Sequence, residues 1–307
     1  MDIMVIIQTM IKLFIMLVLG YILYKVGIFD DHTNKKISSL IVNVTSPLLI
    51  ISSISSAQSG DKTVVLKLIA IGIAMYAGFV VFGKILTRII PFPKDDKKIY
   101  ELCTVFANTG FMGYPVLLSI FDSASVFYCA MLHMAFNLYI YTYGVLTLSN
   151  KGNEKFKFDP KVLVTPGLIL SVVAMIIFLL NIPIPTLIQD VASTVGGVTS
   201  PMSMMMIGSS LATYPIKESI SDKWSYIFAP IRLLLIPFVT MLVCKLLNVD
   251  PYFANIAIVI NAMPAASMVL MFATQYNANK SVATKNIIVT TVLSVITIPI
   301  VVATMML

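Results

Sequence analysis

Residues 108–115 of this 307-residue chain read NTGFMGYP, and they lie in the middle of a long apolar segment, Ile99–Phe121. A proline in a helix interior removes one backbone hydrogen bond and costs about 3 kcal/mol or more. Gly110 and Gly113 give the turns just before Pro115 additional conformational freedom. In a lipid bilayer, freed backbone groups are tolerated only where protein or a water-filled cavity satisfies them. The stretch therefore predicts a membrane helix that is broken near its middle.

The rest of the chain has the composition of a membrane protein. Hydrophobic residues make up 58% and charged residues 11%, whereas soluble domains average about 25% charged residues. This composition excludes a disordered chain and a soluble enzyme with a single anchor. The formal net charge of +7 is no argument for nucleic acid, because Lys and Arg gather in the cytoplasmic loops of membrane proteins. We expect an all-α protein that is surrounded by lipid and has no nucleic-acid partner.

Ten segments are long and apolar enough to span a bilayer, since a spanning helix needs about 20 mostly apolar residues. The connections between them are too short for a soluble domain. The predicted segments are Ile3–Tyr24, Ile37–Ile54, Val64–Leu86, Ile99–Phe121, Ala124–Leu148, Val162–Leu180, Thr186–Leu211, Trp224–Leu247, Tyr252–Tyr276 and Ile287–Met306.

Basic residues are distributed unequally between the two sets of loops. The loops that alternate from the end of the first segment contain sixteen Lys or Arg, and the opposite loops contain three, Lys62, Lys67 and Lys245. Cytoplasmic loops carry the excess of basic residues. The chain is therefore predicted to lie in the cell (cytoplasmic) membrane with both termini outside.

The two halves of the chain carry related motifs. VTSP occurs at residues 44–47 and again at 198–201, in the second and seventh segments. Asn108 precedes Pro115 in the fourth segment, and Asn261 precedes Pro264 in the ninth. Five segments per half is an odd number, so the halves must have opposite orientations in the membrane. We predict an inverted repeat of residues 1–150 and 151–307.

The motif at residues 108–115 resembles the N-x-G-F-x-G-x-P signature of the auxin efflux carrier family, in its short prokaryotic branch. The resemblance covers the whole chain, including a short central loop at Asn150–Pro160 and prolines in segments four and nine. Plant members often carry a long central loop, so its absence argues against a plant hormone carrier. Bacterial relatives are commonly described as permeases for malate, malonate or related carboxylates.

The resemblance implies an elevator-type transporter with a fold like that of sodium/proton antiporters and bile-acid symporters. Helices one, two, six and seven would form the scaffold and the surface of a homodimer, and helices three to five and eight to ten would form the moving transport domain. Helices four and nine would cross at their breaks, with Gly113, Pro115 and Pro264 at the crossover.

Broken helices expose backbone N–H groups and a partial charge of about +0.5 at each N-terminus, and such ends bind carboxylates without an arginine. The predicted substrate-binding residues are Asn108, Thr109, Gly110, Asn261, Met263 and Ala265, with Asn43 and Ser46 reaching in from the second segment. The alternative is that these polar residues are satisfied inside the helix bundle.

Ionisable residues inside a membrane are costly and suggest function. His133 and Asn137 lie four residues apart on one face of the fifth segment, where they would support the crossover or simply pack between helices. Arg232 would attract anions or extend its charge to the cytoplasmic interface, and we favour the second interpretation. Lys12, in the first segment, has no evident role.

Several chemistries have no signature in this sequence. The crossover motifs contain no Asp or Glu, which argues against a paired-carboxylate site for proton exchange. No phosphate loop, metal-ligand spacing or nucleophile motif occurs, so we expect no metal, no cofactor and no enzymatic activity. The predicted function is secondary transport of a small organic anion, a carboxylate. The alternatives are a sodium-coupled organic-anion symporter of the bile-acid type and a non-transporting membrane sensor for a small acid or lipid.

Overall fold

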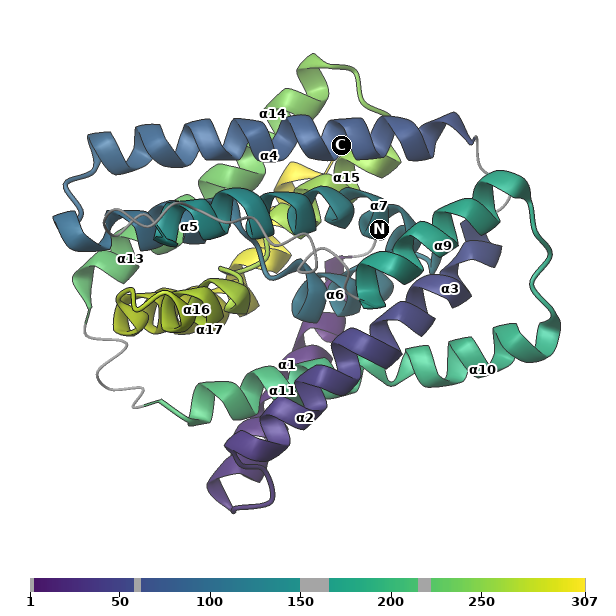
Figure 1. Ribbon diagram of the computed structural model, residues 1–307, viewed down its shortest axis with the longest axis horizontal. Helices are drawn as coiled ribbons and strands as arrows, with labels where there is room; N and C mark the ends of the chain where they lie inside the picture. The colour runs from purple at the N-terminus through teal and green to yellow at the C-terminus, as the bar shows by residue number, and fades with distance from the viewer. Residues whose placement is uncertain (1–2, 58–61, 150–165, 215–221, 307) are drawn as a thin grey trace. The chain divides into compact units, whose positions relative to one another are not determined.

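The computed structural model describes residues 3–57, 62–149, 166–214 and 222–306, and within these ranges the regular structure is helical (Figure 1). Six helical runs in the described residues are long and apolar enough to cross a membrane, and the protein is therefore a multi-pass membrane protein. They are Ile7–Lys25, Asp31–Ala57, Thr63–Ile89, Ala124–Ser149, Lys223–Leu246 and Lys280–Met305.

The remaining four predicted segments are shorter or interrupted. Ile99–Phe121 and Tyr252–Tyr276 are each broken near the middle. Thr186–Leu211 divides at Val198 into two helices. The described part of Val162–Leu180 is the helix Pro166–Leu180. The ten-helix count and the inverted repeat stay predictions, and the central loop at Asn150–Pro160 lies outside the described residues.

The chain forms two compact units, and it passes from the second unit to the first between Asn108 and Thr109, inside the NTGFMGYP stretch. The first unit contains Met1–Ile69, Thr109–Met134 and Val164–Pro215, and the second contains Ala70–Asn108, Ala135–Leu163 and Ile216–Leu307. Each unit therefore combines residues from both predicted repeats.

Helix packing in the first unit depends on glycines that allow backbones to touch. A Cβ atom at Gly20 would lie 1.9 Å from the carbonyl oxygen of Met205, and one at Gly208 would lie 1.8 Å from that of Leu17. These contacts join α1 (Ile3–Lys25) to α11 (Thr199–Ala212). The helix α3 (Ser46–Ala57) packs against α9 (Pro166–Leu180) and α10 (Thr186–Gly197), as Figure 1 shows. The other elements of this unit are α2 (Asp31–Leu40), η1 (Ile41–Thr45), η3 (Thr109–Gly113), α6 (Tyr114–Ile120) and the first part of α7 (Ala124–Tyr139).

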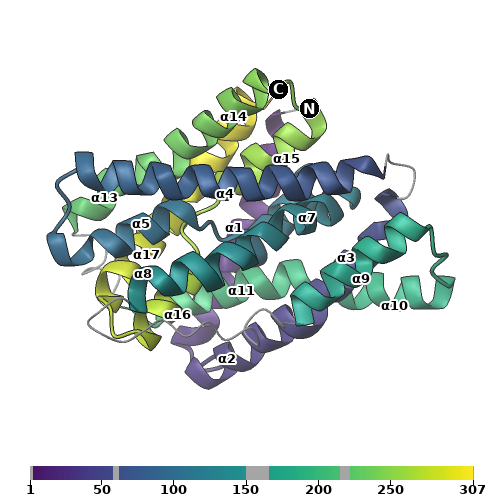
Figure 2. The same cartoon turned by 45° about the horizontal axis from the view of Figure 1, so that its top comes forward.

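The second unit surrounds an aromatic core. Tyr76, Phe79, Phe106 and Phe136 form ring contacts with centroids 5.4–6.2 Å apart. The helices α14 (Ile236–Leu246) and α15 (Pro251–Asn261) lie side by side (Figure 2). The other elements are most of α4 (Thr63–Ile89), η2 (Lys94–Asp96), α5 (Lys97–Val105), the end of α7, η4 (Ile140–Gly144), α8 (Val145–Ser149), α13 (Lys223–Pro230), η6 (Ile231–Leu235), α16 (Ser267–Gln275) and α17 (Lys280–Met305).

Polar residues at the helix ends define where several helices begin and end. Asp30, Asp222 and Asp250 each accept a hydrogen bond from a backbone N–H in the first turn of the helix that follows, which satisfies one otherwise unpaired donor. Three helices end just before an asparagine with a φ near +50°, a conformation that asparagine adopts more readily than most residues. These asparagines are Asn181, Asn248 and Asn277.

At three places a proline follows a widened helical turn. Three π-helical turns, η1, η3 and η6, each end two residues before a proline, namely Pro47, Pro115 and Pro237. A proline ring collides with the carbonyl group four residues earlier, and that carbonyl group lies within the π turn in all three cases. We attribute each wide turn to the need to accommodate this ring.

Candidate functional site

Two interrupted stretches in the second unit, residues 106–108 and 262–266, pair through their backbones at a site that we call the crossing. The helix α5 ends at Val105 and is followed by extended chain at Phe106, while α15 ends at Asn261 and α16 begins only at Ser267. The Asn108 N–H donates to the Pro264 carbonyl at 2.8 Å, and the Ala266 N–H donates to the Phe106 carbonyl at 2.9 Å. These bonds form an antiparallel bridge between Ala107 and Ala265. Backbone groups that are freed at one break therefore form hydrogen bonds with backbone groups freed at the other.

The helix α17 braces this crossing from one side. The Thr290 hydroxyl accepts a hydrogen bond from the Ala265 N–H at 3.2 Å and donates to the Asn286 carbonyl at 2.6 Å. Thr290 is not among the site residues predicted from the sequence. Its signal was available, because Asn286, Thr290 and Ser294 recur every fourth residue in an apolar segment and so share one helix face.

The helix ends at the crossing carry partial charges. The helix α16 starts at the break, and its N-cap residue Ala266 makes no side-chain capping bond. The partial positive charge at this helix start is therefore not reduced by a cap. The carbonyl ends of α5 and α15 carry the opposite partial charge.

Four of the predicted substrate-binding residues and Pro264 lie at this crossing. Asn108 is 4% exposed and contributes its backbone N–H to the bridge. Asn261 is 2% exposed, and its side-chain amide donates to the Ala257 carbonyl of its own helix at 2.9 Å and lies 3.1 Å from the Met75 sulfur. Met263 and Ala265 are fully buried in the interrupted stretch. The structure thus brings Asn108, Asn261, Met263 and Ala265 into one region.

The remainder of the NTGFMGYP stretch belongs to the first unit. Thr109 and Gly113 are buried, and Gly110 is partly exposed with open space where a Cβ atom would lie. Pro115 is the second residue of α6 and does not interrupt the chain there. The break itself lies at residues 106–108, before Pro115, and a role of Pro115 in the crossover stays a prediction. The proline is accommodated by the π turn before it, whereas Pro264 does lie within its break.

The predicted residues of the second and fifth segments have local contacts. Asn43 is exposed and donates to the Ser39 hydroxyl at 3.0 Å, and Ser46 is buried at the start of α3. His133 contacts the Tyr114 ring at a centroid distance of 6.1 Å. Asn137, one helical turn later, belongs to the second unit. Asn43, Ser46 and His133 therefore belong to the first unit.

Arg232 is completely buried, which contradicts the expectation that its charge reaches the cytoplasmic interface. Its exposed fraction is 0%, and its Nη1 atom lies 3.5 Å from the Thr104 carbonyl oxygen near the end of α5. The π turn that holds Arg232 turns the side chain inward. Lys12, by contrast, is exposed on α1.

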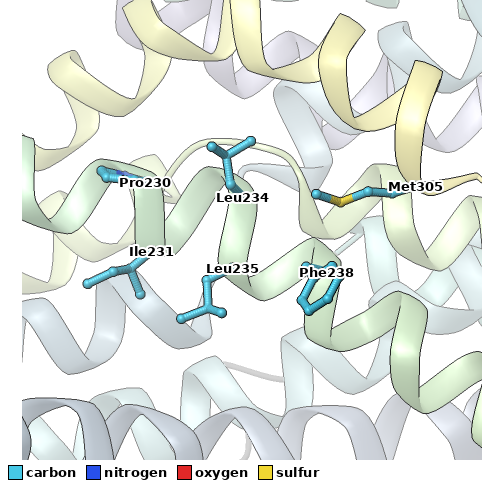
Figure 3. A pocket seen from close by; sticks show the side chains of 6 residues that line it. All are labelled: Pro230, Ile231, Leu234, Leu235, Phe238 and Met305. Atoms are coloured by element: carbon cyan, nitrogen blue, oxygen red, sulfur yellow. The ribbon is translucent and has the colours of Figure 1, made fainter.

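The outer face of the same π turn is apolar. Pro230, Ile231, Leu234, Leu235, Phe238 and Met305 line a shallow groove (Figure 3). Leu235 and Phe238 are about two-fifths exposed, at 39% and 41%. Such a surface suits lipid chains and offers no polar group to a hydrophilic ligand.

Among the described residues, no three His, Cys, Asp or Glu side chains gather in a way that would hold a metal ion. The crossing instead consists of backbone groups, amides and helix ends within a multi-pass helical membrane protein.

Comparison with known proteins identifies the family. The family model described as membrane transport protein matches residues 5–302, so the chain belongs to this family. The resemblance to the auxin efflux carriers is confirmed. An uncharacterized transporter of Methanocaldococcus jannaschii is 26% identical over 296 residues, covering 92% of this chain and 94% of the relative. Another, from Methanothermobacter thermautotrophicus, is 23% identical over 300 residues, covering 95% and 96% respectively. The protein is a membrane transporter and not an enzyme.

Proposed function

We propose that the protein is a secondary transporter that moves a small organic anion, a carboxylate, across the cytoplasmic membrane. The observation that carries this proposal is the reciprocal pairing of Phe106–Asn108 with Pro264–Ala266. Interrupted helices at corresponding places in two halves of a membrane protein are the best structural pointer to a substrate site.

The chemistry of the crossing favours an anion. The uncapped start of α16 presents backbone donors and partial positive charge, and carboxylates bind readily to such helix ends. Asn108 and Asn261 add neutral amides in a buried setting. The stretches 106–108 and 262–266 contain no acidic residue that would repel the substrate.

The proposed mechanism is an elevator motion in a homodimer with both termini outside. Helices one, two, six and seven would form the static scaffold. The close backbone contacts of Gly20 and Gly208 support this assignment, because tightly packed small residues favour stable helix association in membranes. The rest of each repeat would move with the substrate.

A proteoliposome screen tests the proposed function. Purified protein is reconstituted, and uptake of radiolabelled malate, malonate and other small carboxylates is measured with membrane potential and ion gradients set independently. Saturable flux of a carboxylate without sodium supports the proposal. Strict dependence on sodium supports the bile-acid type of symporter instead, and saturable binding without flux supports a sensor.

A further inference from the structure

Arg232 is a buried cation whose hydrogen-bonding capacity is largely unused. Its side chain has no exposed surface, and the contact of Nη1 with the Thr104 carbonyl is long, at 3.5 Å. Neither Nε nor Nη2 has a hydrogen-bond partner, and no carboxylate of the described residues pairs with the guanidinium. Buried arginines are normally paired with an anion or fully hydrogen-bonded.

A second unsatisfied side chain lies on α17, which packs against both α5 and η6. Asn286 is 0% exposed, and neither its Oδ1 nor its Nδ2 atom makes a hydrogen bond of normal geometry. Asn286 approaches the Tyr100 hydroxyl and the Cys103 thiol, and Arg232 lies within electrostatic range of the same thiol. Two unpartnered polar groups therefore lie on η6 and α17, two elements that pack against each other and against the last part of α5.

The contact with α5 does not neutralise this arginine. The carbonyl end of a helix carries about half a negative charge, which leaves a net positive charge in an apolar interior. The free atoms on the guanidinium, Nε and Nη2, are both donors, and the Asn286 amide adds further donors. A planar guanidinium with two adjacent free donors matches the two oxygens of a carboxylate.

We propose that Arg232 and Asn286 form a buried binding site for a small anion beside the crossing of the two interrupted helices. The anion accepts hydrogen bonds from Arg232 Nε and Nη2 and from the Asn286 amide, and it neutralises the guanidinium. This inference rests on the proposed function in one respect, since the carboxylate of the transported substrate is one source of the anion. A resident chloride ion is the other source.

Thermal unfolding of the purified full-length protein tests the site. Potassium malonate and potassium chloride are titrated separately at constant ionic strength in a large sulfonate buffer. We expect at least one of them to raise the unfolding midpoint of the wild type saturably. A response to malonate alone identifies a carboxylate site, and a full response to chloride identifies a resident inorganic anion.

The variant Arg232→Met separates an anion site from a structural arginine. We expect this variant to lose the anion-dependent rise and to unfold at a higher temperature than the anion-free wild type, because an unpaired buried charge has been removed. Arg88→Met is the matched control, since Arg88 is exposed and is the other arginine of the chain. It should keep the wild-type response. An Arg232→Met protein that is less stable than the wild type, or does not fold, overturns the proposal in favour of a structural contact with α5.

Asn286→Ala gives an independent measure. Because its amide atoms have no partner, we expect unchanged anion-free stability and an apparent anion Kd raised about tenfold. A wild-type Kd in this variant, or the absence of any anion response in the wild type, contradicts the site. Proteoliposome uptake keeps the two proposals apart. Wild-type uptake by Arg232→Met excludes the transported carboxylate as the occupant of the anion site, whereas the absence of all carboxylate flux in the wild type sinks the proposed function.

Discussion

Asn108 and Asn261 occupy matched positions in the sequence but contribute different atoms to the crossing. Asn108 pairs through its backbone, whereas the Asn261 side chain donates to the carbonyl of Ala257 in its own helix. The sequence motif was sufficient to locate both residues. The different use of their amides depends on where each helix stops, and that is decided by contacts distant in sequence.

The first prediction concerns these two amides. The Asn261 side chain makes one bond within its own helix and one to the Met75 sulfur on α4, and a thioether sulfur is only a weak acceptor. We therefore expect the unfolding midpoints of Asn108→Ala and Asn261→Ala to lie within a few degrees of the wild type. Carboxylate uptake should fall about tenfold or more, because a substrate-facing polar contact is lost. The measurements are thermal unfolding and initial uptake rates in proteoliposomes.

Thr304→Ala provides the control for this prediction. Thr304 is exposed, and its hydroxyl donates to the Ile300 carbonyl of its own helix at 2.7 Å. The variant loses an equivalent bond within a helix and should transport normally. Normal uptake by both asparagine variants would remove them from the site, and strong destabilisation would make them structural.

The second prediction concerns Thr290. Replacing it with Val keeps the shape of the side chain but leaves the buried Ala265 N–H without its acceptor, which costs about 1–3 kcal/mol. Thermal unfolding should therefore show a clear loss of stability in Thr290→Val. Thr290→Ser keeps the hydroxyl and should lie much closer to the wild type; equal loss in both variants would mean that methyl packing, rather than the bond, is important.

At the level of whole elements, the prolines explain why the sequence located the broken helices better than the breaks themselves. Pro115 was expected to interrupt its helix, yet α6 continues through it because η3 widens the preceding turn. The actual break at Phe106 is stabilised by pairing with Ala266. No local sequence pattern around Phe106 indicates that its pairing partner lies 160 residues further along the chain.

The third prediction compares two adjacent glycines at the end of α10. A Cβ atom at Gly196 would lie 2.7 Å from the backbone of Leu49, whereas one at Gly197 meets nothing within 4 Å. We expect Gly196→Ala to destabilise the protein by about 1–3 kcal/mol through overpacking. Gly197→Ala should be neutral or stabilise by up to about 1 kcal/mol, because alanine favours helix. Equal thermal midpoints for the two variants would contradict the close packing of α3 and α10.

For the whole molecule, composition alone was sufficient to establish a multi-pass helical membrane protein, because a chain with 11% charged residues leaves few alternatives. The number of crossings is harder to read, since a broken helix and two short helices have similar hydropathy. The burial of Arg232 could not be predicted either. The hydropathy value of a charged residue is the same whether its side chain faces lipid or the protein interior.

The fourth prediction concerns orientation. Lys94, in the short turn η2, and Thr186, the first residue of α10, are both exposed, and they adjoin connections of the two opposite sets. Single cysteines at these positions should react with a membrane-impermeant maleimide only from the cytoplasmic side and only from the outside, respectively. The three native cysteines are buried, so the wild-type protein serves as the background. Reaction of both positions from the same side would contradict the proposed topology.

The fifth prediction concerns charge movement during transport. Arg232 stays with the protein and returns in every cycle, so the net charge moved per cycle is that of the substrate. An uncoupled carboxylate should therefore respond to membrane potential, with a driving force of about 2.3 kcal/mol per charge per 100 mV. Uptake is measured at potentials set with potassium and valinomycin. Flux that ignores the potential, or that strictly requires a sodium or pH gradient, would show that a cation is coupled.

The π turns also make the direction of a side chain sensitive to the deletion of a single residue. A π turn holds one residue more than an α turn, and each residue of an α-helix rotates the chain by about 100°. An in-frame deletion of one codon within Ile231–Leu235 would restore an ordinary helix and rotate Arg232 by that angle relative to everything after it. The side chain would then leave the interior while its own codon remained intact. The inward direction of this arginine thus depends on the number of residues in its helix as much as on the identity of the residue.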